Sequence, residues 1–201
     1  MEKKQLGGSI ELRETDSGKT IAGYAAVFYR DSDPGSEYGL WDGAVERIMP
    51  GAFDNFRDHD VRALFNHDSN QVLGRQKSGT LKLSVDERGL RYEITPNDSA
   101  TYRNVAGMIE RGDVDGSSFQ FFIRDQEWRD LDDGREVREI KEVELLDVGP
   151  VTFPAYSSAT SEASSADARS SEAYQQHCKR REAEQAQRAA NKRRLNSINL
   201  P

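Results

Sequence analysis

The sequence predicts an α+β fold that is mainly β, an antiparallel sheet or barrel with flanking helices. Short segments with alternating apolar residues, separated by Gly, Pro and Asp, run through residues 1–156. Only one segment of that region has clear helical periodicity. Strands and helices do not alternate regularly, so a parallel βαβ architecture is not expected.

The expected strands are bounded by turn residues. Residues 81–94 alternate apolar and polar positions on both sides of DERG, which is typical of a hairpin with one buried face. GSSFQFFI at 116–123 is nearly continuously apolar, which favours a central strand. The other expected elements are a hairpin at 11–28 with its turn at DSGK, a short helix from Ala52, a strand at 61–67, and two strand-like arms within 135–155.

One helix is expected in this region, between Asp98 and Gly112. Asp98 or Ser99 can cap its first turn, and Gly112 is a typical C-terminal stop. Tyr102 and Val105 begin an apolar stripe at helical spacing, so the helix should pack on the sheet.

Composition changes after residue 156, which predicts a folded domain at 1–156 and a low-complexity basic tail at 157–201. The tail has eight Lys/Arg and five Asp/Glu, so the preceding residues carry 20 and 30 of the totals, a net of −10. Its Ser/Ala-rich first half cannot bury enough apolar area to fold alone. Its second half contains good helix formers and is expected to be helical when docked. A solvated tail and a docking tail for an acidic partner both remain open.

Charge and residue usage argue against several classes of partner. The net charge of −7 gives no general attraction to nucleic acid or anionic membranes. No run of about 18 apolar residues is present to span a bilayer. The single cysteine, Cys178, allows no internal disulfide. We therefore expect a soluble intracellular protein with neither nucleic acid nor membrane as partner.

The motifs present in the sequence favour a serine nucleophile as the main catalytic hypothesis. Phosphate-binding glycine motifs and metal-binding His/Cys spacings are absent from the sequence, so no metal and no other cofactor is expected. Of His59, His67 and His177, only His67 lies at the end of an expected strand of residues 1–156. In RGDVDGSSFQFFI, two serines enter an apolar strand, where a hydroxyl could be a nucleophile if a histidine base were nearby. A binding module in which these residues never meet is the alternative.

Five strings in order make the chain resemble the tailed-phage head maturation (prohead) protease family. They are GYAAVF, ERIMPGAF, LFNHD followed by VLGR, DVDGSSFQFF, and ELLDVGPVTFPAY. The resemblance covers about residues 8–160. Each string alone is weak, but their order and spacing are specific.

The resemblance implies a fold and an activity. The family is similar to the herpesvirus assembly proteases, which are antiparallel β-barrels ringed by helices. Its members are serine endopeptidases that cut the scaffolding part of the major capsid protein inside the immature head, in the host cytoplasm, and then degrade themselves. Self-association is a further expectation by this similarity. A catalytically inactive capsid-assembly or scaffold-binding protein on the same fold is the alternative function.

The resemblance also implies the site residues. The histidine of the family's HD pair is the general base, which is His67 here. The family serine directly precedes phenylalanine, which selects Ser118 as the nucleophile, although Gln120 replaces a usual glycine. Asp147 matches the acidic position of the closing string and would orient the imidazole. Glu144 is the runner-up for that role, three residues earlier and so on the opposite face of a regular strand.

The resemblance gives the tail a role as well. A protease enclosed with its substrate needs an attachment to the assembling core, and residues 157–201 could provide one. We predict self-cleavage between about Ala155 and Ala173, where order should stop.

Overall fold

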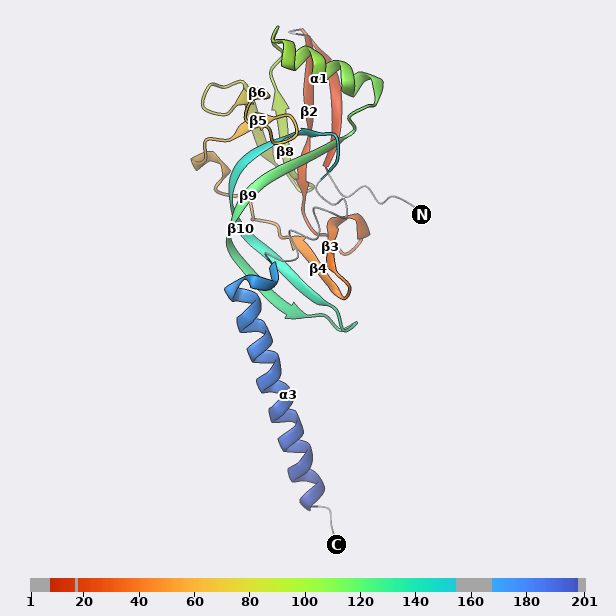
Figure 1. Cartoon of the computed structure of the whole chain (residues 1–201), viewed down its shortest axis with the longest axis vertical. Helices are drawn as coiled ribbons and strands as arrows, with labels where there is room; N and C mark the ends of the chain where they lie inside the picture. Colours follow the sequence, from red (N-terminus) through yellow and green to blue (C-terminus); the bar gives the residue numbers. More distant parts are fainter. Residues whose placement is uncertain (1–7, 17, 155–167, 199–201) are drawn as a thin grey trace.

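The computed structural model describes residues 8–16, 18–154 and 168–198. Its main body is a large sheet crossed by one long, arched strand pair, β9 and β10, and a long helix projects from the lower end of this pair (Figure 1). The strands are β1 (Gly8–Thr15), β2 (Gly18–Val27), β3 (Glu37–Trp41), β4 (Ala44–Ile48), β5 (Arg62–Leu64), β6 (Val72–Arg75), β7 (Leu81–Val85), β8 (Gly89–Ile94), β9 (Gly116–Asp130) and β10 (Glu136–Val151). The helical elements with both ends in the described ranges are two 3₁₀ turns, Pro34–Ser36 and Phe56–Asp58, together with α1 (Ala100–Arg111) and α3 (Glu172–Ile198).

Local sequence signals correctly predict most of these elements. β1 and β2 pair antiparallel around the expected turn, and β7 and β8 form the hairpin around DERG. The side chain of Ser99 caps α1 by accepting a hydrogen bond from the Tyr102 N–H, and Gly112 ends the helix with φ +78°. The short helix expected from Ala52 begins later, as the 3₁₀ turn at Phe56.

The sheet is mixed and open, which corrects the expectation of an antiparallel barrel. Its strand order is β3-β4-β10-β9-β1-β2-β8-β7, and β5 and β6 join beside β10. β10 pairs in parallel with both β4 and β5. Among the described residues no pairing joins the two ends of the sheet, so the coarser statement of a mainly β fold with added helices is the one that holds.

β10 is a single strand where the sequence indicated two arms. It pairs with β9 from Glu136 to Val151, and irregularities near Lys141 and Leu146 divide the pairing without ending it. Bulges bend a strand and change which residues face the core. They explain why the alternation of this segment looked like two separate strands.

The main core lies between β1, β2, β8, α1 and one face of β9 and β10. Tyr92, Phe53, Ile21 and Ile140 are among its largest fully buried side chains. Ser117 enters this core and shares a hydrogen bond of 2.6 Å with the hydroxyl of Tyr92. Gly23 leaves the space for it, because a Cβ there would lie 2.5 Å from the Ser9 carbonyl oxygen and 3.0 Å from the Ser117 hydroxyl.

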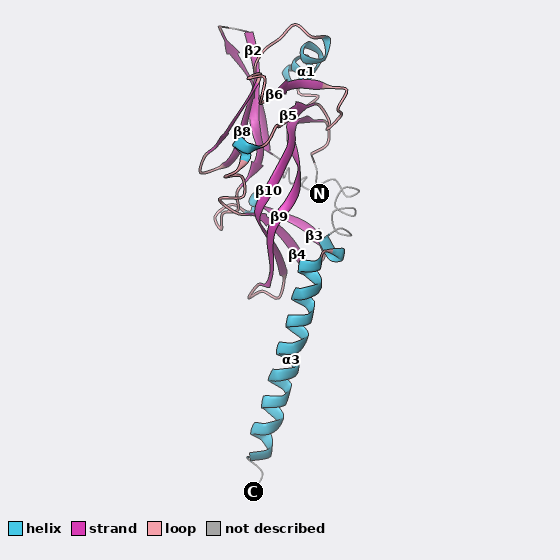
Figure 2. Cartoon of the chain, turned by 90° about the vertical axis from the view of Figure 1, so that its left-hand side faces the viewer, coloured by secondary structure: helices cyan, strands magenta, loops and turns pink. Residues whose placement is uncertain are grey.

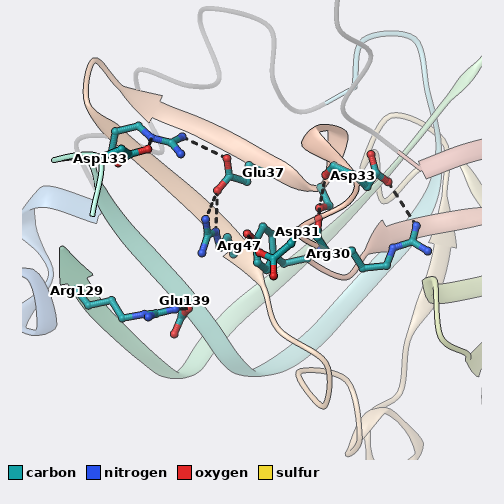
Figure 3. A network of polar contacts seen from close by, with 11 residues as sticks. Arg30, Asp31, Asp33, Glu37, Arg47, Arg129, Asp133 and Glu139 are labelled. Carbon is teal, nitrogen blue, oxygen red and sulfur yellow. Dashed lines mark hydrogen bonds and ion pairs between the residues drawn. The ribbon is translucent and has the colours of Figure 1, made fainter. Parts of the chain in front are cut away.

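A polar network stabilises the lower part of the sheet, around β3 and β4 (Figure 3). Glu37 accepts hydrogen bonds from Arg47 and from Arg135, which also pairs with Asp133. Burial alone would raise the pKa of Glu37, but the hydrogen bonds from the two arginines outweigh it and lower that pKa. The carboxylate therefore stays ionised and holds β3 to the end of the β9–β10 hairpin.

The base of α3 docks on this lower part, whereas the rest of the helix projects away from the body (Figures 1 and 2). Tyr174 packs against Trp41 and Trp128, with ring centroids 5.5 and 4.7 Å away. Burial, followed by the charge of Glu136, raises the pKa of Tyr174 to about 12, so the phenol stays neutral. Side chains of residues 182–191 are exposed. The helix expected in the second half of the tail is thus present, anchored at one end.

The described residues cover the predicted division into a domain and a tail only in part. The first half of the predicted tail lies mostly outside the described residues, and the boundary at 156/157 stays a prediction. Ala168, beyond that boundary, is fully buried beside Trp128. No helix in the described ranges is long and apolar enough to cross a membrane.

We predict that Trp128→Ala detaches the base of α3. Trp128 is 2% exposed, stacks on Trp41 and packs against Tyr174, so truncation should destabilise this cluster by about 3 kcal/mol. Amide hydrogen exchange in residues 172–181 should accelerate while exchange in β7 and β8 stays unchanged. Exchange in the α3 base equal to wild type would show that the aromatic cluster does not hold the helix.

Candidate active site

The three residues selected from the sequence come from three neighbouring strands or their loops. Ser118 lies near the start of β9, Asp147 lies in the last third of β10, and His67 follows β5 by three residues. β10 lies between the other two strands, because it pairs with β9 on one side and with β5 on the other. The sheet thus brings together segments that are far apart in the sequence.

The two adjacent serines point to opposite faces of β9. Ser117 faces the core and bonds to Tyr92, and Phe119 and Phe121 pack on the same side. Ser118 must therefore lie on the opposite, outer face of β9, together with Gln120, although it is only 4% exposed. Of the two hydroxyls, only that of Ser118 lies on the face that carries the other predicted site residues.

Asp147 faces outward because of the irregular pairing before it. Gln120 is its partner on β9, and Glu144 is opposite Phe122, so both acidic residues lie on the outer face. The expectation that Glu144 would point the other way is wrong, since the bulge at Leu146 adds one residue between them. Glu144 forms an ion pair with Arg124, and it is Asp147 that meets the histidine.

His67 sits in a tight loop that closes the β5–β6 hairpin. The Phe65 N–H donates to the Gln71 carbonyl, and the Asp68 N–H donates to the Phe65 carbonyl. Asn66 and His67 both have left-handed backbone conformations, with φ of +54° and +57°. Such a conformation in histidine costs about 1–2 kcal/mol, so the surrounding contacts must hold it. Asp68, in contrast, caps this turn by bonding to Asn70.

Asn66 clamps this loop to the end of β10. Its backbone N–H donates to the Pro150 carbonyl at 3.0 Å. Its side-chain oxygen accepts from the Thr152 N–H at 2.7 Å, and its side-chain nitrogen donates to the Thr152 hydroxyl at 3.1 Å. Asparagine also tolerates the left-handed backbone better than most residues. Sequence reasoning missed this residue, although it directly precedes His67.

Gly149 lets β5 approach β10 closely enough to bring the histidine loop over the strand. A Cβ at this position would lie 2.0 Å from the carbonyl oxygen of Leu64, the last residue of β5. Any side chain would push β5, and with it His67, away from Asp147. The glycine in the string LDVGP therefore has a direct structural role in the site.

His67 and Asp147 form a short hydrogen bond, with Nδ1 and Oδ1 separated by 2.6 Å. The Asp147 side chain is 6% exposed, and the imidazole is 21% exposed. A buried carboxylate must be paired, and an ionised one can only accept, so Nδ1 carries the proton. The other ring nitrogen, Nε2, is then free to accept a proton.

The sheet register relates Ser118 to this pair. Ser118 is opposite Gly149, and Asp147 is two residues earlier on the same face. Such diagonal neighbours have Cα atoms about 7–8 Å apart, a separation that an imidazole with one hydrogen bond at each nitrogen can bridge. Within the described residues no hydrogen bond joins the Ser118 hydroxyl to the imidazole. Catalytic hydrogen bonds are often long in resting sites and tighten when substrate binds.

The other two histidines have structural roles. Nδ1 of His59 accepts a hydrogen bond from the Leu145 N–H at 3.1 Å, just before the bulge that turns Asp147 outward. His177 lies buried at the base of α3, near Asp130 and Glu136. This trio is the one group in the described ranges with metal-ligand spacing, but the guanidinium of Arg181 already pairs with both carboxylates.

Comparison with known proteins agrees with the earlier resemblance. The model of one family, the caudovirus prohead serine proteases, matches residues 8–177 of the 201. No curated protein and no solved structure matched the chain. The matched range includes β5, β9 and β10, and it extends into the docked part of α3.

We predict that Asn66→Gly displaces His67 without unfolding the chain. Glycine accepts the left-handed backbone but removes both side-chain bonds to Thr152. Labelling of Ser118 by a fluorophosphonate should slow by about tenfold to a hundredfold, because small displacements of a catalytic group have effects of this size.

Thr152→Ser is the matched control, since it keeps both the hydroxyl and the backbone N–H. Its labelling rate should equal that of wild type. If Asn66→Gly is labelled at the wild-type rate and its imidazole proton resonance in NMR spectra is unmoved, the bonds from Asn66 to Thr152 do not hold His67 in place.

Proposed function

Because the chain belongs to the caudovirus prohead serine protease family, we propose that it is an active serine endopeptidase with Ser118, His67 and Asp147 as its catalytic residues. The observation that carries this proposal is the hydrogen bond between His67 Nδ1 and the buried Asp147 carboxylate. It leaves Nε2 able to accept a proton on the face of the sheet that carries Ser118. This is the arrangement that a histidine base requires.

The proposed reaction is acyl transfer in two steps. His67 Nε2 takes the proton of Ser118 while the hydroxyl oxygen attacks the scissile carbonyl, and Asp147 stabilises the imidazolium. The imidazolium then protonates the leaving amine, which gives an acyl-enzyme on Ser118. Water deprotonated by His67 attacks the ester, releases the carboxylic acid and restores the serine.

The proposed substrate is the scaffolding part of the major capsid protein, cleaved inside the immature phage head in the host cytoplasm. Family membership supports both the capsid partner and the prohead location. α3 supports an attachment role, because it projects from the body and is held at its base alone (Figure 2). The net positive charge of residues 157–201 would favour an acidic partner.

We also propose self-cleavage between about Ala155 and Ala173, a segment that lies largely outside the described residues. Its support comes from the residue that precedes it. Pro154 lies against Gly116, where a Cβ would come within 2.3 Å of the proline ring, and Gly116 is two residues before Ser118. Pro154, the last described residue before this segment, therefore lies close to the proposed nucleophile.

Substitution of the two adjacent serines should have opposite effects on processing. In co-expression with the capsid protein, wild type should remove an N-terminal capsid segment and its own tail, whereas Ser118→Ala should do neither. Ser117→Ala should still process both, with stability lowered by about 1–2 kcal/mol through loss of the bond to Tyr92. Intact mass spectrometry of both proteins provides the measurement.

Two other outcomes would contradict Ser118 as the nucleophile or the protease activity itself. Equal processing by wild type and Ser118→Ala would move the nucleophile elsewhere, first to Ser117. No processing by any variant would favour the inactive capsid-assembly protein on the same fold.

Substitution of the two acidic residues of the outer face should have unequal effects on catalysis. Asp147→Asn should lower kcat by about 10⁴-fold, because an amide cannot hold the required imidazole tautomer. Glu144→Gln should change kcat less than threefold or so, since it breaks only an exposed pair with Arg124. Steady-state cleavage of a capsid-derived peptide gives both values. The reverse ranking of the two variants would assign the orienting role to Glu144.

A further inference from the structure

The exposed large apolar side chains of the described residues gather around the proposed site. They are Val72, Phe122, Leu146 and Phe153, which are 49%, 56%, 37% and 76% exposed, and we call them the apolar rim. Val72 pairs with Leu64, three residues before His67, and Leu146 directly precedes Asp147. A cluster of exposed apolar groups around one point of a surface usually marks a binding site.

The rim flanks Ser118 on both sides along the strands. Phe122 lies four residues after Ser118 on β9 and on the same outer face. Phe153 lies four residues after Gly149, the partner of Ser118 on β10, and the two strands run in opposite directions. Phe122 therefore lies about 13 Å from Ser118 along β9. Phe153 lies at a similar spacing in the opposite direction, past the end of β10.

Arg124, a charged residue beside Phe122, already has a partner. Arg124 pairs with Glu144 and lies over the ring of Phe122, with 5.9 Å from its guanidinium carbon to the ring centroid. Gln120, between Ser118 and Phe122, is exposed and uncharged. Next to Phe122, the surface along which a peptide would approach the nucleophile thus offers apolar contacts, an uncharged amide and an ion pair that is already formed.

A peptide fits this surface better than a second folded copy. Four partly exposed side chains present roughly a few hundred Å² of apolar area, whereas a stable dimer buries about 800 Å² per partner. The rim also flanks Ser118, which is only 4% exposed and which the scissile bond has to reach. An extended chain advances about 3.3 Å per residue, so its side chains can reach both ends of the rim while its middle lies at Ser118.

Resting on the proposed function, we infer that the apolar rim is the substrate-binding surface of this protease. It takes an extended peptide with apolar side chains about four residues from the scissile bond, one on Phe122 with Leu146 beside it and one on Phe153. Phe122 and Phe153 determine specificity and are not catalytic residues.

The test is a cleavage profile of the full chain on a proteome-derived peptide library, read by mass spectrometry. Wild type should prefer apolar residues about four positions from the cut. In Phe122→Ser this preference should disappear on one side, and kcat/KM for a preferred peptide should fall about tenfold, mainly through KM. Phe122→Leu, which stays apolar, should keep the preference, and Phe153→Ser should lose it on the other side.

Fluorophosphonate labelling of Ser118 separates this inference from the proposed function. If wild type, Phe122→Ser and Phe153→Ser are all labelled and all cleave peptides with the same sequence preference, the inference is overturned and the proposed function stands. Labelling at Ser118 without cleavage of any library peptide would also overturn it. Absence of both labelling and cleavage in wild type would overturn the proposed function together with the inference.

Light scattering of the same proteins tests whether a second copy of the chain, and not a peptide, covers the apolar rim. We expect one mass for wild type and both variants. A wild-type dimer that Phe122→Ser or Phe153→Ser dissociates, with no change in cleavage preference, would assign the rim to a second copy and contradict the inference.

Discussion

The antiparallel pairing of β9 with β10 is the constraint on which the rest of the structure depends. One end of the pair places Ser118 opposite Gly149, and the other end provides the aromatic surface where α3 docks. The three register shifts in this pairing decide which side chains face the core. A one-residue slip would turn Ser118 inward and Ser117 outward, so the register determines which hydroxyl can react.

The geometry around His67 is held against local strain. Its left-handed backbone is unfavourable by itself, and it persists because Asn66 bonds to Pro150 and Thr152 while Gly149 lets β5 approach. The buried carboxylate of Asp147 then finds its partner in the imidazole N–H. The backbone and side-chain hydrogen bonds of Asn66, together with one glycine, thus position the histidine so that Nε2 is directed away from the carboxylate.

Sequence patterns predicted the parts of the fold that local physics determines. The hairpins, the capped helix α1 and the apolar strand β9 follow from alternation, capping and turn residues within short windows. The parallel pairings of β10 and the bulge at Leu146 depend on long-range contacts that leave no local signal. For that reason an antiparallel barrel was expected where the sheet is mixed and open, and Glu144 was placed on the wrong face. The choice of His67, Ser118 and Asp147 came from family resemblance, and no periodicity would have indicated Asn66 or the role of His59.

The most direct test of this account is to identify the residue that a fluorophosphonate modifies, by peptide mass spectrometry, in wild type and in His67→Ala. The account predicts one modified residue, Ser118, in wild type and almost no modification in His67→Ala, since the serine would lose its base. Modification of another serine, or of Ser118 at the same rate without His67, would contradict the proposed catalytic arrangement.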